Sequence, residues 1–158
     1  MVHPLIGVHA AIGELGVLAF LWVFIELMNP SAQGIKRCKK AAIVGVVCFL
    51  TVWVTGGIYY VMYYGPQVKP LILAGPQPWA HKIVMEAKEH IFLFLPFLAI
   101  SVLGAISSLG NSLLKDKNAR RTVQWLSALC VILGMAMALM GYLISTAARL
   151  SLELGVKP

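Results

Sequence analysis

The chain has 158 residues, of which 59% are hydrophobic, and its mean hydropathy is +0.84. A domain of this length cannot bury so much apolar surface in one core, so the composition excludes an ordinary soluble protein and predicts one embedded in a lipid bilayer. Thirteen Lys and Arg against six Asp and Glu give a formal charge of +7, which topology and anionic lipid headgroups explain without nucleic acid as a partner.

Four apolar stretches are long enough to cross the hydrocarbon, which takes about 20 helical residues. The first lacks the basic leading segment of a signal peptide and carries Glu14 and Glu26, so we expect it to be retained as a helix. The stretches cover approximately residues 4–28, 41–64, 83–109 and 123–146. The sequence thus predicts an all-α protein, a transmembrane four-helix up-down bundle that forms a single integral membrane domain over residues 1–158.

The connections between these stretches differ in charge. Residues 29–40 contain four basic residues and no acid, and residues 110–122 contain four basic residues and one acid. Since cytoplasmic loops are enriched in Lys and Arg, both connections are predicted to face the cytoplasm. The Pro- and Gly-rich connection 65–78 and both termini then face the outer side, periplasmic or extracellular. We expect a multi-pass protein of a bacterial or archaeal inner (cytoplasmic) membrane.

All four histidines lie at the start of the first or the third apolar stretch. His9 is 20 residues before Asn29, and His90 is 20 residues before Gly110. At ~1.5 Å per residue, both imidazoles are expected about 30 Å above the cytoplasmic end, near the outer hydrocarbon boundary. An intramembrane histidine marks a functional site by default, and two at one depth can share a ligand. Hydrogen bonding between helices is the alternative for this pair.

Small residues accompany the first of these histidines. Gly13 and Gly16 follow His9 by four and seven residues and therefore share its helix face. They predict a groove for a flat cofactor below the imidazole, although small residues also let membrane helices pack closely without any cofactor. Arg149, near the outer end of the fourth stretch, can pair with a haem propionate at the water boundary or simply anchor the helix end.

The sequence is also compatible with a metal site that contains no porphyrin. Glu86 lies one turn before His90 on the same face, a spacing that can chelate one ion. With His9 opposite, the three side chains predict a site for iron, copper or zinc. In a haem protein, Glu86 would instead orient the ring of His90.

Two roles can be written for each of the other ionisable residues considered. His3 and His81 are expected farther out, where they form a second outer site or are solvated, and helical phase separates them from the His9 and His90 pair. Glu14 is expected about 22 Å above the cytoplasmic end, within the hydrocarbon. It is either a proton-relay or quinone contact or a hydrogen-bonded structural acid.

The short loops, the histidines near one surface, the glycines beside His9 and the outer arginine together resemble the small integral-membrane b-type cytochromes of respiratory complexes. This resemblance implies one haem b near the outer face, with His9 and His90 as axial ligands. Electrons would pass between an outer-side redox protein and a quinone or another membrane subunit. No histidine pair lies near the cytoplasmic face, as diheme anchors would require. We expect an electron-transfer subunit without catalytic residues of its own rather than an independent enzyme.

Two functions of other classes remain. One is a non-haem metal protein, for metal oxidation or transport, that uses His9, Glu86 and His90. The other is a cofactor-free structural or assembly subunit of a membrane complex, whose polar residues bind partner helices.

Overall fold

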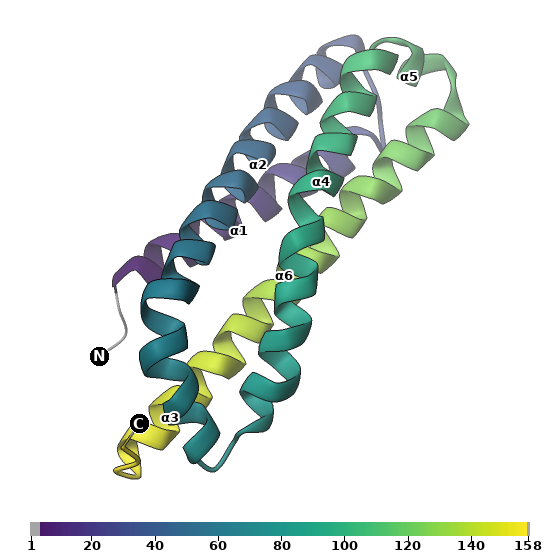
Figure 1. The fold of residues 1–158 in the computed structure, drawn as a ribbon. Helices are drawn as coiled ribbons and strands as arrows, with labels where there is room; N and C mark the ends of the chain where they lie inside the picture. Colours follow the sequence, from purple (N-terminus) through teal and green to yellow (C-terminus); the bar gives the residue numbers. More distant parts are fainter. Residues whose placement is uncertain (1–3, 158) are drawn as a thin grey trace.

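The computed structural model describes residues 4–157, and these residues form helices and turns without a β-strand (Figure 1). The α-helices are α1 (Pro4–Glu26), α2 (Ala32–Tyr59), α3 (Lys69–Ala74), α4 (Glu86–Leu109), α5 (Ser112–Lys115) and α6 (Lys117–Glu153). Two further segments, η1 (Tyr60–Val68) and η2 (Ala80–Met85), are π-helical. The all-α prediction is confirmed for the described part of the chain, and His3 lies outside that part.

The elements join into four long apolar helical stretches. Each is long and apolar enough to cross a membrane, and together they are Leu5–Glu26, Ala32–Ala74, Ala80–Leu109 and Lys117–Glu153. Large apolar side chains such as Val61 and Trp125 are exposed on their surfaces. Such a surface requires lipid around it, so the chain is a multi-pass integral membrane protein.

Local capping extends two of the helices beyond the predicted apolar stretches. The Ser31 hydroxyl accepts a hydrogen bond from the Gly34 amide at 2.9 Å, which starts α2 inside the basic connection. The Asp116 carboxylate likewise accepts from two amides at the start of α6. Arg37 donates to both oxygens of Glu26, at 2.7 and 3.0 Å, and ties the turn between α1 and α2. The basic connections are therefore largely helical rather than open loops.

The largest departure from the sequence prediction is the connection 65–78. The helix that begins at Ala32 continues through η1 and α3 to Ala74, and only a short turn separates it from η2. Pro66 lies inside the π-helical segment. A proline removes one amide donor and crowds the carbonyl four residues earlier, and the wider π-helical turn accommodates it without ending the helix.

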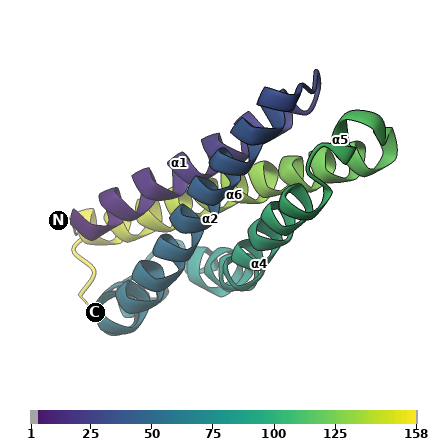
Figure 2. The same ribbon diagram turned by 90° about the horizontal axis from the view of Figure 1, so that it is seen from above.

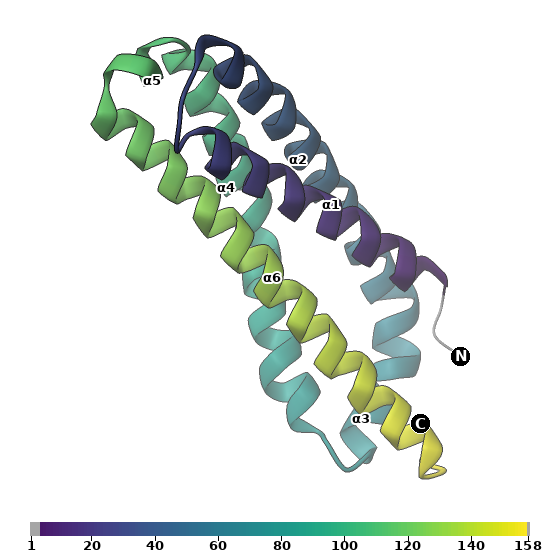
Figure 3. The ribbon, with the colours of Figure 1, turned by 180° about the vertical axis from the view of Figure 1, so that it is seen from behind.

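The four long stretches pack in a ring. Helix α2 packs on both α1 and α4, and α6 packs on the same two helices from the other side. Viewed from above, α1 and α4 lie on opposite sides of α2 (Figure 2). The start of α1 and the end of α6 lie toward the end of the bundle where α3 is found, whereas α5 lies at the other end (Figure 3).

Buried apolar side chains form two separate clusters. The larger, called the main core, includes α1 from Val17 onward, α2 as far as Phe49 and α4 from Leu95 onward, with parts of α5 and α6. It depends on close helix contacts, since Phe20 and Phe49 stack with their ring centroids 5.5 Å apart across α1 and α2. The smaller cluster, called the Tyr64 cluster, lies toward α3 and contains Tyr64, Ile72, Ala80, Ile144 and Ala147.

Replacing Gly134 by Ala is expected to loosen the contact between α6 and α1. A Cβ atom at Gly134 would overlap Cγ2 of Val17, a stiff β-branched side chain, whereas a Cβ at Gly104 on α4 meets nothing within 4 Å. Overpacking of this kind costs about 1–3 kcal/mol, so G134A should unfold at a lower temperature in detergent than G104A. The G104A control gains the same helix propensity, and equal melting temperatures for the two variants would contradict the contact.

Candidate functional site

Polar side chains gather on the helix segments between the main core and the Tyr64 cluster. We call His9 on α1, Thr55 on α2, and Lys88 and Glu89 on α4 the polar layer. In α1, α2 and α4 these residues lie toward the α3 end, beyond the last residues that belong to the main core. Ionisable groups at membrane depth are costly and mark candidate functional sites.

The imidazole of His9 is held in one orientation. Its Nδ1 lies 3.3 Å from Oγ1 of Thr55, and the Thr55 hydroxyl donates its own hydrogen to the Thr51 carbonyl at 2.9 Å. Because a hydroxyl has a single hydrogen, Thr55 must accept from Nδ1–H of His9. In the neutral ring, Nε2 then carries a free lone pair. Histidines that bind metals are commonly fixed in this way, with the second nitrogen bonded to the protein.

The space around His9 is set by a glycine that sequence reasoning missed. A Cβ atom at Gly56 would lie 2.8 Å from Cε1 of His9 and 3.1 Å from Cε2 of Phe92. The imidazole therefore occupies a notch between α2 and α4 that only a glycine leaves open. The signal in the sequence was the run Thr55, Gly56, Gly57 in the middle of an apolar stretch, which supplies one hydroxyl and two positions without side chains.

The predicted glycines below His9 serve helix packing. A Cβ at Gly16 would lie 2.6 Å from Cε1 of Phe49, and one at Gly13 would lie 3.8 Å from Cγ1 of Val52. Side chains of α2 thus fill the face that the sequence suggested as an open groove. This is the packing alternative, in which small residues bring two membrane helices together.

His90 is also fixed through Nδ1, but it points elsewhere. Its Nδ1–H donates to the Glu86 carbonyl at 2.7 Å, so Nε2 is again the free nitrogen. The side chain is exposed, on the face of α4 shared with the exposed Leu93 and Phe97. Phe92, which contacts the His9 notch, follows His90 by two residues and therefore lies about 200° around the helix. The structure does not bring His9 and His90 together, and their pairing stays a prediction.

His81 is a buried member of the region around the Tyr64 cluster, with 4% of its surface exposed. Its Nδ1 lies 3.0 Å from the Tyr64 hydroxyl, and its Nε2 lies 3.9 Å from Oε1 of Glu86. Solvation, one of the two expectations for His81, is therefore wrong. Glu86 lies beside His81 rather than in a shared site with His9, and the described residues contain no group of three metal-ligating side chains.

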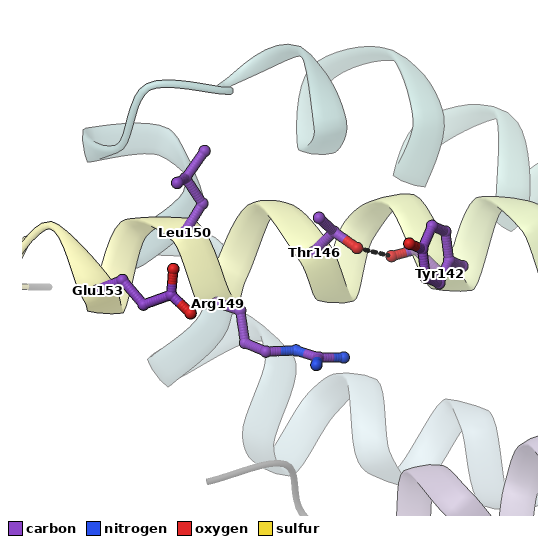
Figure 4. Close-up of a pocket in the computed structure, with 5 residues that line it drawn as sticks. All are labelled: Tyr142, Thr146, Arg149, Leu150 and Glu153. Carbon is purple, nitrogen blue, oxygen red and sulfur yellow. Dashed lines mark hydrogen bonds between the residues drawn. The ribbon is translucent and has the colours of Figure 1, made fainter.

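Arg149 lines an open groove on the surface of α6. The groove has a volume of about 270 Å³, and its lining residues all come from α6: Tyr142, Thr146, Arg149, Leu150 and Glu153 (Figure 4). The cation of the polar layer is instead Lys88, whose Cε lies 3.9 Å from the position of a Cβ on Gly141 of α6. The Lys88 side chain therefore lies against α6.

Two buried polar atoms near this layer have no hydrogen-bond partner among the described residues. They are Nε1 of Trp53 and Oε1 of Glu89. The Trp53 ring stacks on Phe92 with centroids 6.2 Å apart, which places it beside the notch of His9. Buried polar atoms without a partner are rare in folded proteins, so these two are candidates to bind an ordered water or a ligand.

The cavity next to these residues is small. It has a volume of about 20 Å³ and is lined by Phe49, Val52, Trp53, Phe92, Leu95, Pro96 and Met137. Ligand pockets usually measure roughly 300–1,000 Å³, so neither this cavity nor the α6 groove can enclose a porphyrin in the arrangement described. The first half of α1 is only loosely packed, since none of residues 5–15 is buried and a Cβ at Gly7 would meet nothing within 4 Å.

Comparisons with known proteins add no identification. No family model, no curated protein and no solved structure matches the chain.

A double-mutant cycle tests the contact between Tyr64 and His81. Either H81L or Y64F leaves a buried polar group unpaired, so each should lower the free energy of unfolding by about 1–3 kcal/mol. The double variant removes both groups and should be less destabilised than the sum of the two changes. Denaturant unfolding in detergent measures this, and additive effects would show that the two side chains do not interact.

Proposed function

We propose that the protein is a membrane-embedded electron-transfer subunit of a respiratory or redox complex and that it binds one b-type haem through His9. The observation that carries the proposal is the state of His9. Its Nδ1 is bonded to Thr55, its Nε2 is free, and it lies in a notch at Gly56 near the unpaired Nε1 of Trp53. These are the features of an imidazole prepared as a ligand.

The surrounding residues have roles consistent with this proposal. A bound haem would supply one-electron redox chemistry. Thr55 orients the His9 ring, and Trp53 and Phe92 provide an apolar wall. Lys88 offers a cation inside the layer for an acidic substituent of the cofactor.

His90 stays the proposed second axial ligand, although the described arrangement points it away from His9. The π-helical segment η2 ends at Met85, five residues before His90. π-helical turns contain one residue more than α-helical turns and often occur at functional sites. Conversion of one such turn to α-helix would rotate the start of α4 and change the direction in which the His90 side chain points.

We further propose an up-down bundle with the basic connections in the cytoplasm and both termini on the outer side of an inner membrane. The polar layer then lies toward the outer face, where an outer-side redox protein can approach. A quinone or a neighbouring membrane subunit would be the other electron partner.

One observation favours a different class of function, the cofactor-free assembly subunit. Glu14 is exposed at the centre of α1 and makes no hydrogen bond or ion pair with any residue that the structure describes. A carboxyl group in that position needs a partner outside the chain, whether or not a haem is bound.

A reduced-minus-oxidised absorption spectrum of the purified protein tests the haem proposal. We expect a Soret shift and an α band that are lost in H9A and in H90A. T55V should retain the haem but shift its midpoint potential, because the bond that orients His9 is removed, whereas T51V, one turn away, should not.

Retention of the full spectrum in H9A would show that His9 is not a ligand. A wild-type protein that neither contains haem nor takes it up would exclude the proposal. Stoichiometric iron, copper or zinc without a haem spectrum would favour the non-haem metal site instead.

Reporter fusions test the orientation. Alkaline phosphatase fused after the C-terminus should be active, because this enzyme folds outside the cytoplasm. A green fluorescent protein at the same site should be dark, because it does not fold there. The same reporters inserted in residues 29–40 should give the opposite result. Identical results at both sites would contradict the topology.

A further inference from the structure

Glu14 lies where an acid is least expected in a membrane protein. It is near the middle of α1, 12 residues and therefore about 18 Å from Glu26 at the helix end. Its side chain is exposed and so is that of the neighbouring Leu18. The opposite face of α1, which includes Phe20 and Val23, is buried in the main core. Glu14 therefore points out of the bundle at hydrocarbon depth.

The cost of this placement calls for a partner outside the chain. Insertion scales assign an ionised acid at a membrane centre about 2.5–3.5 kcal/mol, and such acids almost always face a bundle interior, water or a pairing group. Within residues 4–157, Glu14 has no hydrogen bond and no salt bridge. Among the long helices, α1 packs mainly on α2 and α6, and Glu14 itself is exposed, so the face that carries Glu14 is open to another protein.

The residues around Glu14 have the spacing of a helix-pairing seam. Six of the exposed residues of α1 recur at alternating intervals of four and three, and they are Gly7, Ala11, Glu14, Leu18, Leu21 and Ile25. This period of 3.5 residues is that of left-handed helix pairs, the commonest crossing in membrane bundles. Small residues at positions 7 and 11 allow close approach at one end. We call these six residues the α1 seam.

A second copy of the same chain is the partner whose chemistry fits. A protonated carboxyl group both donates and accepts a hydrogen bond, so two of them form a reciprocal pair. Two-fold symmetry about the membrane normal brings identical residues together at the same depth. A lysine or arginine at this position could not pair with its own copy, whereas a glutamic acid can.

We propose that the α1 seam pairs with the α1 seam of a second copy, so that the protein is a parallel homodimer joined by hydrogen bonds between the two Glu14 carboxyl groups. The dimer does not depend on haem, because Glu14 and His9 lie on different faces of α1. If the protein binds no haem, the homodimer proposal still stands. If the protein is not a homodimer, the haem proposal still stands.

Cysteine cross-linking in native membranes tests the seam. The three native cysteines are buried and are first replaced by serine or alanine. Single cysteines are then placed on the seam as A11C or L18C and, as a matched control, on α4 as F97C. Leu18 is 58% exposed and Phe97 is 61% exposed, so access to the oxidant is comparable. With copper phenanthroline, we expect dimers from A11C and L18C and at least tenfold less from F97C.

Variants at position 14 test the carboxyl pair itself. E14Q keeps a group that both donates and accepts, so it should retain the dimer. E14L keeps an apolar seam but removes the hydrogen bonds, and its dissociation constant in lipid vesicles, measured by energy transfer between labelled copies, should rise at least fivefold.

Equal cross-linking of A11C, L18C and F97C would overturn the homodimer. Cross-linking of the seam to a different protein in place of a second copy would overturn it as well. If E14L dimerises as tightly as the wild type, Glu14 does not contribute to the interface.

Discussion

Hydrocarbon offers no hydrogen-bond partners, and this constraint accounts for most of what the structure shows. It requires helices, because a helix satisfies its own backbone groups within one segment. It also explains the hydroxyl side chains inside the spans. Thr51, Ser127, Thr146 and Ser151 each donate to the carbonyl four residues earlier, at distances between 2.8 and 2.9 Å. These residues introduce polarity without needing a second helix. The polar groups that remain are the ones that cannot be satisfied locally, and they define the candidate sites.

The same constraint separates the histidines into two kinds. His81 is bonded through one nitrogen to Tyr64 and has Glu86 near the other, so its polar atoms are largely accounted for within the chain. His9 and His90 each use only Nδ1, toward Thr55 and toward the Glu86 carbonyl. A free Nε2 at membrane depth is an incomplete arrangement. It is this incompleteness, and not the number of histidines near one surface, that favours a ligand at His9.

Sequence reasoning succeeded for properties that vary along the chain and failed for those that vary around a helix. Hydropathy located four stretches able to span a membrane, and the structure confirms them. The common depth of His9 and His90 followed from counting residues, but counting does not give the side to which each ring points. That side depends on helical phase, which π-helical segments such as η2 alter. Whether a groove is open depends on the neighbouring helix, and at Gly16 the Phe49 side chain occupies the expected groove. The sequence predicts a connection over residues 65–78 because this run is rich in Pro and Gly, whereas the helix continues through Pro66.

The chain has unsatisfied polar groups on two opposite sides, and both indicate assembly. Toward the interior, Trp53 and Glu89 each leave a buried polar atom unpaired in or near the polar layer, which a cofactor or ordered water would satisfy. Toward the lipid, Glu14 is exposed within an otherwise apolar helix face. Local hydrogen bonding satisfies the threonines and serines, so these exceptions do not reflect a general tolerance of polar groups. A second helix packed against α1 would give Glu14 a partner. The first half of α1, which is weakly packed, carries both His9, toward the interior, and Glu14, toward the lipid. Pairing at the α1 seam would therefore also stiffen the wall of the bundle that carries His9, which would link dimer formation to the order of the polar layer.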